Sequence, residues 1–175
     1  MTTHPRIILP LILLPVMLFL WGVSATAARA QSEMERERHS LRGVDGFYLS
    51  LNTVGDAAVQ DSLDFAQLHH DLRASLQNAG LPVWPEGNVS AEDRVPYLHV
   101  HVNTVHAGRG LYPFGVEVRF YQAVRLAHDA AAPTVAATWA TSIVGLTSYD
   151  NLGIIPEAAL GLLDDFIEDF QGINP

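Results

Sequence analysis

The stretch from Val95 to Ile143 constrains the fold more than any other part of the chain, because apolar and polar residues alternate along it. It divides into three segments, at residues 97–103, 115–126 and 135–143, with glycine-rich or small-residue turns between them. In the first two segments the apolar positions are Leu98, Val100, Val102, Val116, Val118 and Phe120, and the positions between them are Tyr97, His99, His101, Asn103, Glu117, Arg119 and Tyr121. Successive side chains of a strand point to opposite faces. The pattern therefore predicts a sheet with one buried face and one face in contact with water.

The remaining predicted elements complete the sheet and cover its apolar face. A further strand is predicted at residues 46–54, where apolar residues again alternate with polar ones. Helices are predicted at residues 61–79 and 156–170, because their apolar residues recur at helical spacing. Either Asp61 or Ser62 is expected to cap the first helix, since a short oxygen-bearing side chain can accept a free N–H of the first turn.

This order of elements predicts the α+β class. The expected architecture is a two-layer sandwich, with a four-stranded, mainly antiparallel sheet and two helices on one face, in the order β-α-β-β-β-α. Residues 43–175 are expected to form a single domain, and the charged residues 31–42 a flexible lead-in.

Residues 1–30 have the three parts of a secretory signal peptide. His4 and Arg6 form a weakly basic start, an apolar run follows at 7–23, and Ala28-Arg29-Ala30 has the small residues that a signal peptidase recognises. We therefore expect an exported protein, periplasmic or extracellular after cleavage following Ala30, with no stable membrane insertion. The alternative is an uncleaved anchor, because the run is close to the roughly 17–25 residues that span a bilayer.

Composition excludes several kinds of chemistry. The sequence contains no cysteine, which excludes disulfides, thioether-linked haem, a thiolate nucleophile and a lipid-bearing cysteine. It contains no lysine, and its net charge of −9 argues against nucleic acid as a partner, since phosphate backbones are negative as well. Two alternative explanations fit this acid-rich, lysine-free composition: adaptation to high salt, and a codon bias towards arginine.

The chain resembles small exported bacterial α+β domains of unassigned function. The resemblance rests on the order of elements, on Thr138-Trp139 in the last predicted strand, and on the C-terminal sequence Leu163-Asp-Asp-Phe-Ile-Glu-Asp-Phe-Gln-Gly-Ile-Asn-Pro175. More distantly, it is similar to the compact lipoproteins that assist envelope transport and lipopolysaccharide assembly. These carry an acylated cysteine, so the resemblance implies an envelope location here and no lipid anchor. It implies no functional residues.

His99 and His101 are the residues that most resemble metal ligands. They stand two apart on one predicted strand, so both project from the same face, a spacing that metal sites use. A third ligand is missing, because Asn103 is the next residue on that face and His106 is out of phase. We therefore predict no metal and no cofactor. A metal-binding protein or metal-dependent enzyme using His99 and His101 is the alternative.

Other catalytic patterns are missing from the sequence. It has no Gly-x-Ser-x-Gly nucleophile motif and no phosphate-binding glycine loop. The acidic residues of the last helix have the spacing of a solvated face, and Trp139 is expected in the core. These acidic residues are Asp164, Asp165, Glu168 and Asp169. We therefore expect no enzyme activity.

The leading functional expectation concerns the polar face of the sheet. Tyr97, Arg119 and Tyr121, together with His99 and His101, are predicted to lie on it. Tyrosine and arginine are enriched at protein interfaces because they combine contact area with a polar group. We expect a non-catalytic exported envelope module that binds a protein, or a second copy of itself, through this face. An ordinary hydrated sheet face is the alternative.

Overall fold

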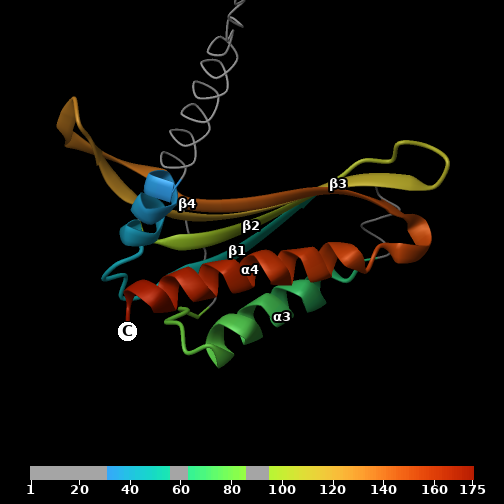
Figure 1. Ribbon diagram of the computed structural model, residues 1–175, viewed down its shortest axis with the longest axis horizontal. Coiled ribbons are helices and arrows are strands. Elements are labelled where there is room, and N and C mark those ends of the chain that lie inside the picture. The colour runs from blue at the N-terminus through green and yellow to red at the C-terminus, as the bar shows by residue number, and fades with distance from the viewer. Residues whose placement is uncertain (1–30, 56–62, 86–94) are drawn as a thin grey trace, which may run out of the picture. The chain divides into compact units, whose positions relative to one another are not determined.

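A four-stranded sheet forms the centre of the fold, as seen in this computed structural model (Figure 1). The structure describes residues 31–55, 63–85 and 95–175, and the predicted signal peptide lies outside them. The strands lie in chain order, β1 (Tyr48–Val54), β2 (Tyr97–Thr104), β3 (Leu111–Leu126) and β4 (Asp129–Ser148). They belong to a compact unit that begins at Glu37, whereas the sequence analysis puts the start of the domain at residue 43.

The sheet is mixed, so the mainly antiparallel pairing that the sequence predicts holds for β2, β3 and β4 and not for β1. β1 and β2 are parallel, while β2 with β3 and β3 with β4 are antiparallel. The physical reason is the helix α3 (Phe65–Asn78), which lies between β1 and β2 in the chain. A helical crossover carries the chain back to the end of the sheet where β1 began, so the next strand runs in the same direction.

The hairpin of β3 and β4 is longer than predicted. β3 begins at 111 rather than 115, and β4 covers 129–148 rather than 135–143. The residues predicted as a loop at 127–133 are mostly strand, and only the turn at 127–128 joins the two. Phe120 pairs with Trp139 and Tyr121 with Ala137, so Thr138 is an extra residue in β4. This bulge changes the face to which the preceding residues of β4 point.

The long helices α3 and α4 (Ile154–Ile173) lie on the same side of the sheet (Figure 1). α3 packs against β1, α4 against β3 and β4, and the helices touch each other. Asp64 caps α3, because its Oδ1 accepts a hydrogen bond of 2.8 Å from the Gln67 N–H. This corrects the predicted cap at Asp61 or Ser62, two residues outside the described ranges.

The described ranges contain a third α-helix, at residues 31–40, in the stretch that the sequence predicts as a flexible lead-in. They therefore hold one α-helix more than the two predicted. A short 3-10 helix, η2 (Tyr149–Asn151), also precedes α4. After the first helix, Leu41 is fully buried, and the Asn174 side chain donates to its carbonyl and accepts from the Gly43 N–H. The stretch predicted as a lead-in therefore ends in contacts with the core and with the C-terminus of α4.

The core lies between the sheet and the two long helices. Phe47 is at its centre, with its ring edge-on to those of Phe120 and Phe166 at centroid distances of 5.5 and 5.6 Å. Each large apolar side chain buried in this way contributes about 1.5–3 kcal/mol. The fully buried residues include Leu72, Leu76, Leu98, Val100, Val102, Val116, Val118, Ile155 and Leu163. None of the helices in the described ranges has the length and apolar content that a membrane crossing requires.

Candidate functional site

The face of the sheet opposite α3 and α4, here called the open face, arranges its side chains in rows across the strands. In β2, and in β3 as far as Phe120, every second residue is buried under the helices, and the residues between them are at least partly exposed on the open face. The strand register defines four rows: Tyr48, Tyr97, Tyr121 and Ala137; then Ser50, His99, Arg119 and Ala140; then Asn52, His101, Glu117 and Ser142; then Val54, Asn103, Gly115 and Val144. All five residues that the sequence predicts as a site lie in the first three rows.

Tyr97 and Tyr121 form the aromatic centre of the first row. Their rings stack at a centroid distance of 4.8 Å with an angle of 9° between the planes. The His99 ring lies edge-on to Tyr121 at 6.3 Å. Burial, followed by the neighbouring Tyr121, raises the pKa of Tyr97, so its phenol stays protonated and can donate a hydrogen bond. The stack thus combines the apolar area of two rings with two hydroxyl groups.

His99 lies in the middle of the open face and is partly buried there. Its Nδ1 is 3.2 Å from Ser50 Oγ, and its ring stacks on that of His101 at 6.1 Å. Partial burial lowers the pKa of His99, with further lowering by His101 and Arg119, while Glu117 acts in the opposite direction. At neutral pH the ring is therefore uncharged and can both accept and donate a hydrogen bond.

Arg119 and Glu117 are the charged groups of these rows. Arg119 Nη2 is 2.8 Å from Glu117 Oε2, and both side chains are about two-fifths exposed. The hydrogen bond with Tyr121 and the charge of Glu117 raise the pKa of Arg119 further. An exposed pair of this kind contributes about 0–1 kcal/mol to stability. Its chemical significance is that it holds the guanidinium beside the tyrosine stack.

The two histidines of the face do not gain a third metal ligand in the described part of the chain. His101 lies opposite Glu117 in the register, and His106 stacks on Tyr112 at 5.0 Å. No group of three or more histidine, cysteine, aspartate or glutamate side chains in the described ranges is placed to hold a metal ion. In this part of the chain, His99 and His101 therefore stand as a pair without a third such ligand.

The far end of the open face is apolar, which the sequence analysis missed. Val144 is 83% exposed and Leu146 is 61% exposed, both on β4. Val54, Val105 and Leu111 are also exposed at this end of the strands. The signal was present in the sequence, because Val144 and Leu146 continue the alternation of β4 beyond its predicted end.

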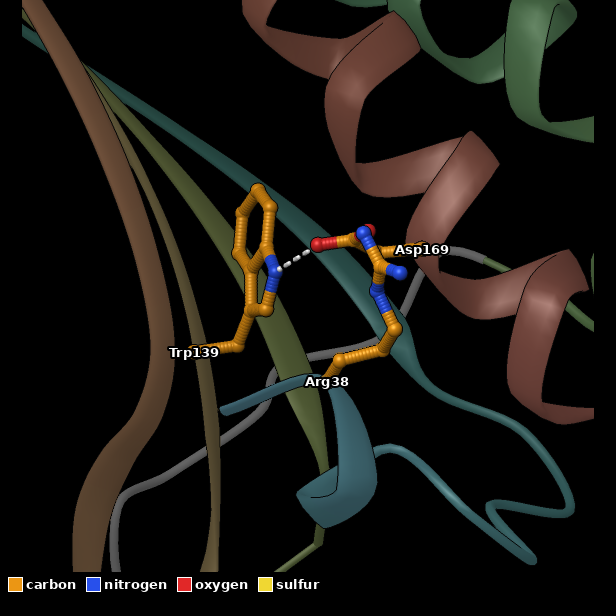
Figure 2. Close-up of polar contacts among 3 residues, drawn as sticks. All are labelled: Arg38, Trp139 and Asp169. Atoms are coloured by element: carbon orange, nitrogen blue, oxygen red, sulfur yellow. Dashed lines mark hydrogen bonds and ion pairs between the residues drawn. The ribbon is translucent and has the colours of Figure 1, made fainter. Parts of the chain in front are cut away.

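A second polar cluster lies on the helix side of the sheet (Figure 2). The indole N–H of the buried Trp139 donates to Asp169 Oδ2 at 2.9 Å, and Arg38 Nη2 pairs with Asp169 Oδ1 at 2.5 Å. Asp169 is thus no member of a solvated acidic face, which corrects the prediction, whereas Trp139 lies in the core as predicted. Each oxygen of the Asp169 carboxylate thus has a partner within the chain, and the cluster ties α4 to β4 and to the first helix.

Comparisons with known proteins add little to this geometry. No protein-family model matches the sequence, and the search of curated proteins found no match. Among solved structures, the chain is similar to one described as a minor lipoprotein from Acinetobacter baumannii, with 12% sequence identity and a TM-score of 0.27. The alignment covers 75% of this chain and 90% of that chain. A TM-score this low does not establish a shared fold.

Proposed function

We propose that the open face binds a protein, and that the chain is a non-catalytic exported module of the cell envelope. The observation that carries this proposal is the first row of the face, where Tyr48, Tyr97 and Tyr121 stand side by side on three neighbouring strands. Arg119 and the uncharged His99 follow in the next row. Large aromatic side chains with polar tips, joined by an arginine, are the residues on which binding energy concentrates in protein interfaces.

The charge of the face supports a protein partner. Among the residues of the four rows, Glu117 is the one carboxylate, and Arg119 neutralises it. The acidic side chains of α4 lie on the other side of the sheet, although the whole chain has a net charge of −9. An interface on the open face therefore buries no uncompensated acid, which would otherwise be strongly unfavourable.

The envelope location is part of the proposal and rests on the sequence. Residues 1–30 have the basic start, apolar run and Ala-x-Ala site of a secretory signal. An exported binding module meets its partner outside the cytoplasm. The partner should therefore be captured in intact cells rather than in a cytoplasmic extract.

Site-specific photo-cross-linking tests the proposal. A photoreactive amino acid is placed at Asn52, which is exposed on β1 beside His101 and far from β4. We expect a covalent adduct with another protein on irradiation of cells. Tyr121→Ala should reduce the adduct about tenfold or more, since removing an interface anchor usually costs at least about 2 kcal/mol.

The matched control places the same amino acid at Asp165, which is exposed on α4. Position 165 should give no adduct with that protein. Equal adducts from both positions, or an unchanged yield in the Tyr121→Ala variant, would contradict the proposal. An adduct that contains only two copies of the chain would assign the open face to self-association instead.

A further inference from the structure

The outer edge of β4 is a row of backbone groups that no described strand pairs with. On its inner side the pairing with β3 extends to the Tyr149 N–H, which donates to the Gly110 carbonyl at 3.1 Å. Backbone groups alternate in direction along an antiparallel strand. Ser142, Val144 and Leu146 therefore direct their N–H and C=O groups outward.

One end of this edge is closed within the chain. The Thr138 carbonyl accepts a hydrogen bond from Ser40 Oγ at 3.1 Å, and the Gln122 side chain donates to the Ser40 carbonyl at 2.9 Å. The hydrogen bond from Ser40 thus holds Thr138, the extra residue of the β4 bulge. The edge available to another strand therefore begins after it, at residues 140–148.

Residues 140–148 lack the features that usually protect an edge strand from pairing. Natural edges carry charges, prolines or bulges, with lysine the most common device. This segment reads Ala-Thr-Ser-Ile-Val-Gly-Leu-Thr-Ser, with no charge and no proline, and its register with β3 is regular. Ile143 is 44% exposed on the helix side, and Val144 and Leu146 are more exposed on the open face. Both sides of the strand thus offer apolar contacts.

We propose that a second copy of this chain pairs its β4 antiparallel with this one, across a two-fold axis at Val144. The strands of both copies then form one continuous sheet. In this register Val144 lies opposite Val144 of the second copy, Ser142 opposite Leu146, and Ala140 opposite Ser148. All of these side chains lie on the open face, so the two open faces join on one side of the dimer.

The helix side of the same register is also compatible with pairing. Ile143 lies opposite Gly145 of the second copy. A side chain at Gly145 would meet the Phe114 ring, since a Cβ there would be 2.4 Å from Phe114 Cζ. The Phe114 ring thus lies over Gly145, and in the proposed register the Ile143 side chain of the second copy faces this apolar ring. An isologous interface requires this kind of self-complementarity.

Charge leaves this edge as a place where two copies of the chain can meet. The chain has a net charge of −9, so most surfaces of two copies repel each other. The segment at 140–148 is uncharged, and it can meet itself without that repulsion. The acidic helix α4 packs against β4, so pairing brings two α4 helices towards each other. Added salt should therefore strengthen the dimer by screening them. This inference concerns the strand edge and is independent of the function proposed for the open face.

Single cysteines provide a direct test, because the chain has none of its own. The exported full chain is purified with Val144→Cys and oxidised under mild conditions. We expect a disulfide-linked dimer, since residues directly opposite in a hydrogen-bonded antiparallel pair have Cα atoms about 5.5 Å apart, within disulfide range. The matched control is Val54→Cys, in the same row but on the opposite edge of the sheet, which should stay reduced.

Sedimentation over a range of protein concentrations gives the second measurement. The parent chain should show a monomer–dimer equilibrium, and Val144→Lys should raise its dissociation constant at least about tenfold, because a charge on an edge strand opposes pairing. Val144 is mostly exposed, so circular dichroism should show that the variant remains folded. Val54→Lys should dimerise like the parent.

Three outcomes would overturn the inference: a parent chain that is monomeric at all concentrations and salt levels, a Val54→Cys variant that cross-links as fast as Val144→Cys, or a Val144→Lys variant that dimerises like the parent. Tyr121→Ala serves to separate the two proposals. It should dimerise normally even though it loses the partner of the open face.

Discussion

Partial burial makes the His99 ring harder to protonate than an ordinary histidine, because it lowers the pKa of the ring. The ring lies between Ser50, Tyr121 and His101, and burial is the largest cause of its lowered pKa. In the unfolded chain the same ring titrates near 6.5. The unfolded state therefore takes up a proton at a higher pH than the folded state does.

This difference predicts a pH dependence of stability. As the pH falls from about 6.5 through the lower pKa of folded His99, the free energy of unfolding should decrease, because protons stabilise the unfolded chain. His99→Gln removes that component. The variant should therefore lose less stability than the parent between about pH 7.5 and about pH 5, as measured by urea unfolding.

His70→Gln, on the exposed side of α3, is the control and should show the pH dependence of the parent. The NMR titration of the His99 ring protons gives an independent measurement. A midpoint above 6.5 would show that the ring is stabilised in its charged form, and the explanation by burial would then be wrong.

At the scale of elements, one carboxylate joins three parts of the chain. Asp169 on α4 accepts the indole N–H of Trp139 on β4 and pairs with Arg38 near the end of the first helix. Trp139 is almost fully buried, and its ring contacts Phe166 at 5.1 Å. The indole needs a hydrogen-bond acceptor in this position because it cannot reach water.

Asp169→Ala should lower the free energy of unfolding by about 1–3 kcal/mol, because it leaves a buried donor without a partner. Arg38→Ala should cost less than about 1 kcal/mol, since that side chain is 52% exposed and the ion pair is screened. Adding Trp139→Phe to Asp169→Ala removes the orphaned donor as well. The double variant should then lose less than the sum of the two single variants.

Urea unfolding followed by circular dichroism measures these differences, with Asp165→Ala as an exposed control expected within about 0.5 kcal/mol of the parent. Strict additivity of the Trp139 and Asp169 variants would mean that the hydrogen bond between them contributes nothing.

The sequence predicts elements better than it predicts the contacts between them. Alternation at β2 and β3 identifies the buried face, because burial under helices selects apolar residues at every second position. It also places Tyr97, Arg119 and Tyr121 together on the open face. The direction of β1 does not follow from its own residues, since a strand of either direction has the same alternation.

Contacts distant in sequence account for the other differences. Asp169 has the same helical phase as a solvated acid, and only the position of Trp139, thirty residues away, gives it a buried partner. Leu41 likewise has a partner distant in sequence, because its carbonyl accepts a hydrogen bond from the Asn174 side chain. The apolar end of the open face, by contrast, follows a local pattern that extends past the predicted end of β4.

At the scale of the whole molecule, part of the acid excess lies where it opposes folding. α4 carries Asp164, Asp165 and Glu168 on its exposed side, in the C-terminal half of the helix. No basic residue lies in its last turn. Asp164 and Glu168 are four residues apart on one side of the helix, and like charges at this spacing destabilise a helix. The chain also has no lysine to balance them.

We therefore predict that added salt stabilises the fold. Raising the ionic strength from about 0.01 M to about 1 M shortens the screening length from roughly 30 Å to roughly 3 Å, which removes most of the repulsion between exposed acids. The free energy of unfolding should rise with sodium chloride. Replacing the three acids with Asp164→Asn, Asp165→Asn and Glu168→Gln should stabilise the chain at low salt by about 0.2–0.5 kcal/mol and flatten the salt dependence.

These measurements are made on chains that also carry Val144→Lys, which prevents the proposed dimer. Salt also strengthens dimerisation, and without this substitution that stabilisation would add to the effect of screening on α4. A sulfate series is unsuitable, since sulfate strengthens the burial of apolar groups whatever the charge of the protein. If the triple variant and its parent respond equally to sodium chloride, repulsion on α4 does not limit stability. Any rise of stability with sodium chloride would then come from the other acids of the chain.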